Sequence, residues 1–242
     1  MLGAPRFLAG LVAVVAVAAP AMGTPVNSPV LPGLNGSGLI GTAFTLTLLA
    51  ILPAIVICMT SFIRTVIVLS MVRHAFGMPE TPPNAVLISL SLFLTAFTMA
   101  PAISQINAEA IKPLSAGTIT AEQALDRGSV PLRGFMLAQT RDRDIETIYA
   151  ISKTPVPDRP EAVEIMKLTP AFLINELRIA FLIGFVILLP FLVIDLVVSS
   201  ILLSLGMMMV PPQSISLPIK LLMFVLIDGW SLVIQGVLGS FR

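Results

Sequence analysis

The chain has 242 residues, of which 56% are hydrophobic and only 11% are charged, and its net charge is +1. Because soluble globular proteins carry about 25% charged residues, this composition excludes an ordinary soluble domain and indicates an apolar surrounding, either lipid or neighbouring subunits. The small net charge argues against nucleic acid as a partner.

The beginning of the chain is typical of a signal peptide over residues 1–23. Arg6 supplies the positive charge, and residues 7–19 form an apolar core that is too short to cross a membrane. Small residues allow cleavage after Ala21 or Gly23, and a retained anchor is the alternative. Residues 24–38 are rich in proline, glycine, asparagine and serine, which predicts a flexible linker.

A first apolar hairpin is predicted over residues 39–104. Its first arm is much longer than the roughly 20 residues that cross a bilayer, so we expect a break near Pro53 or Thr60. Its second arm is predicted as a helix over residues 85–100, capped by Asn84.

Most of the charged residues lie between 105 and 169, in signs that nearly cancel, which predicts a small water-facing helical domain. Within it, Thr120 and Gln123 have capping-box spacing, and we expect a short helix that stops at Gly128. A run of alternating charges follows and is typical of a solvated face, with a contact between identical subunits as the alternative: Arg141-Asp142-Arg143-Asp144.

A second apolar hairpin is predicted over residues 170–242. Thr169 and Pro170 form a cap followed by a proline, a pattern that starts a helix. Ser216 is expected to cap the last apolar helix, over residues 217–238.

A methionine-rich stretch connects the two arms of this hairpin. Gly206 can close the preceding helix in the left-handed conformation, and Pro211 and Pro212 cannot continue it. We therefore predict a tight loop that contains Met207, Met208 and Met209. Methionine is flexible and fills irregular gaps, so ordinary packing between helices is the alternative to a function for this loop.

Charged residues within the apolar runs are expensive, because a charge in hydrocarbon costs at least about 2.5–3.5 kcal/mol unless it is paired or faces water. Lys220 can pair with Asp195 or with Asp228, or it can extend to an interface. We interpret these residues as structural charges that fix helix packing: Asp195, Lys220, Asp228, Glu176, Arg178 and Arg64.

The catalytic inventory is sparse. One histidine and one cysteine argue against metal sites, and with no phosphate-binding loop we expect no enzyme and no cofactor. Asp195 and Asp228 allow an alternative function, that of an intramembrane aspartyl protease, although Lys220 would compete for both carboxylates. The prolines within apolar segments, Pro53 and Pro190, also fit a multi-pass secondary transporter, although no inverted repeat is visible.

From about Thr60 onward, ordered motifs resemble the FliP family of flagellar type III export-gate proteins, whose injectisome counterparts are the SctR proteins. The most specific are Ile194-Asp195-Leu196-Val197 and Leu205-Gly206-Met207-Met208-Met209-Val210-Pro211-Pro212. The signal peptide and the double proline at Pro211-Pro212 resemble the flagellar proteins more than their injectisome counterparts. Ile219 stands where the family usually has phenylalanine. The other segments on which the resemblance depends are residues 60–64, 82–84, 131–136, 217–222 and 225–230.

The apolar runs predict an all-α fold of kinked apolar helical hairpins with a small polar helical insertion. The resemblance implies that several copies assemble with FliQ and FliR into a helical ring, the channel by which unfolded flagellar proteins are exported, with FlhB and FlhA as further partners. The signal peptide and four apolar segments predict a multi-pass membrane protein with the polar domain on the exported, periplasmic side. The resemblance implies the bacterial inner membrane, within the flagellar basal body. On this resemblance, Met207, Met208 and Met209 form a gasket in the lumen.

Overall fold

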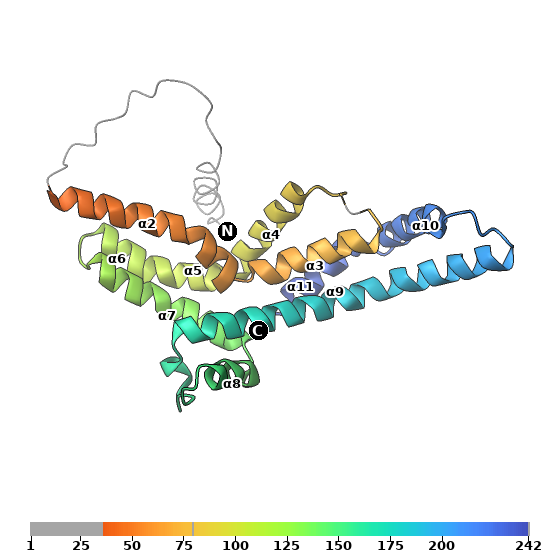
Figure 1. Cartoon of the computed structure of the whole chain (residues 1–242). Coiled ribbons are helices and arrows are strands. Elements are labelled where there is room, and N and C mark those ends of the chain that lie inside the picture. The colour runs from red at the N-terminus through yellow and green to blue at the C-terminus, as the bar shows by residue number, and fades with distance from the viewer. Residues whose placement is uncertain (1–35, 79, 242) are drawn as a thin grey trace, which may run out of the picture. The chain divides into compact units, whose positions relative to one another are not determined.

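The computed structural model describes residues 36–78 and 80–241, so the predicted signal peptide and most of the predicted linker lie outside the described residues. The described residues form helices and no strand, which confirms the all-α fold with kinked apolar helices. The chain divides into two compact units, residues 1–47 and 48–242. Among described residues, the first unit holds only the beginning of α2 (Gly36–Met59), and the later helices belong to the second unit (Figure 1).

Helix α3 (Phe62–Ala75) lies at the centre of the second unit. It packs against α4 (Asn84–Thr98), the long helix α9 (Ile165–Ser204) and α11 (Gly229–Leu238). The close approach of α9 depends on Gly184, because a Cβ atom there would overlap the side chain of Met71. Side chains from α3, α4, α9, α10 and α11 form one buried apolar cluster, which includes Val68, Leu69, Val72, Phe76, Leu87, Leu94, Ala180, Phe191, Phe224, Val233 and Val237.

The apolar helices are bent at short breaks. Residues Ala50–Met59 of α2 make an angle of 69° with α3, so the break lies at Thr60, one of the two predicted positions. The predicted single helix over residues 217–238 is wrong, because α10 (Pro212–Leu226) and α11 meet at 67°. Asp228 lies between them in the left-handed conformation, with φ of 51°, which a continuous helix does not allow.

By length and composition, α9 is the one described helix that is long and apolar enough to cross a membrane by itself. The described part of the chain offers up to four spans if each bent pair counts as one. The third such pair joins α4 to the segment Ala100–Ser115 at 66°. That segment contains α5 (Ala100–Ile106), the π-helical turn η2 (Asn107–Ile111) and α6 (Lys112–Ser115).

The charged insertion is helical, and its longest helix is α7 (Ala121–Gln139). The predicted capping box is confirmed, because the Thr120 hydroxyl accepts from Gln123 N–H and the Gln123 side chain accepts from Thr120 N–H. The predicted stop at Gly128 is wrong. Helix α7 continues through Gly128 to Gln139, although glycine within a helix costs about 1 kcal/mol, and it packs along α5 and η2. The short helices α8 (Asp142–Ile151) and η3 (Pro160–Ala162) follow.

The apolar helices also begin earlier than predicted. Helix α9 begins at Ile165, and the Thr169 hydroxyl donates to the Ile165 carbonyl from within the helix instead of capping it. Helix α10 begins at Pro212, where a proline loses no hydrogen bond because a first-turn N–H has no partner in the helix. Ser216 is consequently buried inside α10. Asn84 is the first residue of α4 and not its cap.

Candidate functional site

The Met loop, residues 205–211, forms the tip of the hairpin between α9 and α10 (Figure 1). Gly206 has φ of 73°, the left-handed conformation predicted for it. The N–H of Met207 donates to the Leu202 carbonyl at 2.9 Å, and that of Gly206 to the Leu203 carbonyl at 3.1 Å. These two bonds satisfy carbonyls that the helix end would otherwise leave without partners, and they turn the chain sharply out of α9.

The methionine side chains of this loop extend away from the packed core. Met207 is 44% exposed, Met208 80% and Met209 98%. Within the described part of one chain, therefore, Met208 and Met209 do not fill a gap between packed helices. A cluster of exposed apolar side chains at a hairpin tip is typical of a surface that meets other molecules.

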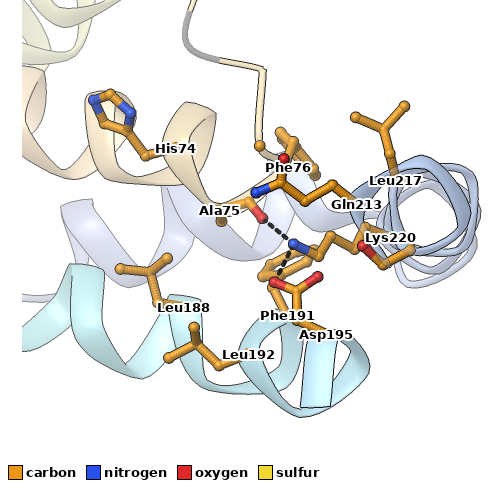
Figure 2. A pocket seen from close by; sticks show the side chains of 12 residues that line it. His74, Ala75, Phe76, Leu188, Phe191, Leu192, Asp195, Gln213, Leu217 and Lys220 are labelled. Atoms are coloured by element: carbon orange, nitrogen blue, oxygen red, sulfur yellow. Dashed lines mark hydrogen bonds and ion pairs between the residues drawn. The ribbon is translucent and has the colours of Figure 1, made fainter. Parts of the chain in front are cut away.

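Lys220 of α10 connects the two helices of this hairpin. Its ammonium nitrogen lies 2.6 Å from Oδ2 of Asp195 on α9 and 3.1 Å from the carbonyl oxygen of Ala75 on α3. Figure 2 shows both interactions beside a pocket of about 150 Å³ that His74 and Gln213 also line. The buried lysine thus holds α10 against two helices at once.

Asp228 takes no part in this cluster. It lies at the corner between α10 and α11, where its carbonyl accepts from the N–H of Leu232, and it makes no ion pair with any described residue. The paired carboxyls that an aspartyl protease requires are therefore not brought together. The sequence allowed Lys220 to pair with Asp195 or Asp228, and in the structure it pairs with Asp195.

A second ion pair, between Arg64 of α3 and Glu176 of α9, is completely buried. The Nε atom of Arg64 donates to Oε2 of Glu176 at 2.8 Å, and Nη2 donates to Oε1. On the opposite side, Nη1 donates to the carbonyl of Ser240 at 3.0 Å and to its hydroxyl at 2.9 Å. The ring of Phe241 covers the guanidinium at 3.9 Å. Each donor edge of Arg64 thus has a partner.

Arg178 interacts with a neighbour on its own helix and forms no ion pair within the described residues. It donates to Oδ1 of Asn175 at 2.9 Å, and Asn175 in turn donates to the carbonyl of Gln139 at 2.6 Å. This short chain of hydrogen bonds joins α9 to the end of α7, beside the Arg64–Glu176 pair. Sequence reasoning identified Arg64 and Glu176 as structural charges but did not pair them. One feature of the sequence could have suggested this pair: a positive charge, Arg64, interrupts one apolar run, and a negative charge, Glu176, lies in another.

Comparison with known proteins agrees with the predicted resemblance. A family model described as the FliP family matches residues 45–237, a range that includes every segment on which the resemblance depends. The chain is 50% identical over 200 residues to the flagellar biosynthetic protein FliP of Pectobacterium carotovorum, covering 83% of this chain and 78% of that protein. It is 45% identical over 207 residues to the Bacillus subtilis protein of the same name, covering 86% of this chain and 94% of that one. The Caulobacter vibrioides protein of that name is 48% identical over 197 residues, 81% of this chain and 74% of that protein.

Proposed function

Since the chain belongs to the FliP family of flagellar biosynthetic proteins, we propose that it is a core subunit of the flagellar type III export gate. Several copies would form, with FliQ and FliR, the channel through which unfolded flagellar proteins are exported. The observation that carries this proposal is the exposed Met loop at the tip of the α9–α10 hairpin, where Met208 and Met209 are almost uncovered by the described residues.

The chemistry of methionine fits a luminal seal. Its side chain is unbranched, apolar and flexible, so loops from several copies can meet and leave water and ions few favourable sites. The same contacts are non-directional. The seal therefore deforms around an unfolded chain of any sequence and closes again afterwards, which a rigid or polar constriction would not do.

The surface of α9 supports assembly with further chains in a membrane. Only 17% of its most apolar 18-residue window is buried within the chain. An apolar surface of this extent needs lipid or protein to cover it. We place the assembly in the inner membrane within the flagellar basal body, with residues 105–169 on the periplasmic side and with FlhB and FlhA as neighbouring partners. The exposed large side chains of α9 include Phe181, Leu182, Phe185, Val186, Leu189, Leu192, Val193, Leu196 and Val197.

The mass of the complex extracted in mild detergent tests this proposal. One chain has a mass of 25.7 kDa. We expect a particle that contains several copies of this chain and its partners and that is many times heavier, measured by light scattering or native mass spectrometry. Recovery of a single chain from flagellated cells, under conditions that keep other membrane complexes intact, would contradict the proposal.

A further inference from the structure

The segment that follows α11 lies across a buried charge. Ser240 and Phe241 are each partly buried, with one side toward solvent and the other toward Arg64. The Ser240 hydroxyl donates to the carbonyl of Val237 at 2.6 Å and at the same time accepts from Arg64. Arg64 is thereby linked to the last turn of α11 through one serine.

A polar pocket lies next to the partners of Arg64, and neither Arg64 nor Glu176 is among the residues that line it. The pocket has a volume of about 590 Å³, and its lining includes Ser240, Gln139, Asn175 and Arg178. A volume of this size is far larger than the roughly 10–15 Å³ needed to hold one water molecule. Arg64 and Glu176 are nonetheless completely buried. Ser240 and Gln139 belong both to the pocket wall and to the partners of Arg64, and Ser240 makes the shorter contacts.

Polar contacts with charged side chains hold the helix pair α10–α11 at two points. Lys220 holds α10 to α9 and α3, and the Ser240–Phe241 segment holds the end of α11 to Arg64. Between these points, the helix pair contains the break at Asp228. Val233 and Val237 also pack α11 into the apolar cluster, so the polar contacts at its end add to that packing.

We infer that Ser240 and Phe241 form a clasp that fixes the position of α11, with Arg64 as its receptor, and that also keeps water of the neighbouring pocket away from the buried ion pair. Opening the clasp frees α11 to move about the break at Asp228 and admits water to Arg64 and Glu176. Phe241 acts here as a positioning residue, because it works through the guanidinium that it covers. The inference concerns a single chain and is independent of the proposed export function.

The test is amide hydrogen exchange of the purified full-length chain, followed by mass spectrometry. Phe241→Leu keeps an apolar side chain but removes the aromatic face, and a cation–π contact with a desolvated guanidinium is a strong one. We expect roughly tenfold faster exchange in α11 and unchanged exchange in α8, because only the clasp opens. Phe241→Tyr retains the aromatic face and should exchange like the unaltered chain.

A double-variant background separates the clasp from general packing. In Arg64→Met with Glu176→Leu the receptor is gone, so adding Phe241→Leu should change α11 exchange by less than about twofold. An equal effect of Phe241→Leu in both backgrounds would overturn the inference, and so would unchanged α11 exchange in the single variant. Should Phe241→Leu fail to fold, Ser240→Ala removes the hydroxyl that accepts from Arg64 and donates to Val237 but keeps the main-chain acceptor, and we expect α11 exchange to rise about threefold.

Discussion

Replacing Met207, Met208 and Met209 together with alanine is expected to open an ion leak through the assembled gate without reducing the amount of gate recovered. The three side chains are exposed in the chain, so their truncation removes no core contact and should change the free energy of unfolding by less than about 0.5 kcal/mol. In the proposed seal, alanine would be too short to meet its counterparts from other copies. We expect the conductance of gates reconstituted in planar bilayers to rise by roughly tenfold or more.

Two control variants define what the seal requires. Leucine at the same three positions keeps an apolar side chain of similar volume, so conductance should stay low. Met166→Ala truncates a methionine that is 85% exposed but lies outside the Met loop, and it should have no effect on conductance. A triple alanine variant that conducts like the unaltered gate would exclude a sealing role for the Met loop.

Glu176→Ala is expected to destabilise the chain by about 3–5 kcal/mol, because it leaves the buried guanidinium of Arg64 without its carboxylate. Folded domains are stable by only about 5–15 kcal/mol, so a loss of this size removes a large share of the total. Little folded chain should be recovered, and what is recovered should unfold at a clearly lower temperature. Circular dichroism of the detergent-solubilised chain during heating measures this.

An exposed ion pair at the start of α9 offers a matched control for the buried pair. Glu164 lies beside the start of α9, its side chain is 63% exposed, and its pair with Lys167 spans 3.1 Å. Because exposed pairs contribute at most about 1 kcal/mol, Glu164→Ala should leave the unfolding temperature nearly unchanged. Replacing both buried charges, Arg64→Met with Glu176→Leu, should recover most of the loss. Equal unfolding temperatures for Glu164→Ala and Glu176→Ala would contradict the assigned role of the buried pair.

Features that depend on neighbouring residues in the chain could be predicted from the sequence. The capping box at Thr120 and the left-handed Gly206 are decided within a few residues, and the structure has both. The stop predicted at Gly128 failed because the packing of α7 against α5 and η2 lies outside any local window. The corner at Asp228 was missed because the prediction followed the mean hydropathy of residues 217–238, although Asp228-Gly229 is a dipeptide that marks turns.

Pairings between distant residues could not be predicted in the same way. Arg64 and Glu176 are 112 positions apart, so their contact requires knowing that α3 packs on α9. Lys220 had two candidate aspartates, and the packing of α10 against α9 brings it to Asp195. The chemistry of each residue showed that a partner was needed, and only the packing of the helices identified it.

Crosslinking through the Met loop tests the central claim most directly. Cys58 is the one cysteine of the chain, so Met208→Cys in a Cys58→Ala background places a single thiol at the hairpin tip. If the loops of several copies meet in a shared lumen, mild oxidation of the intact complex should link chains in pairs through residue 208. Chains that remain unlinked, with the thiol modified instead by a lipid-soluble reagent, would show that the loop faces lipid and would contradict the account.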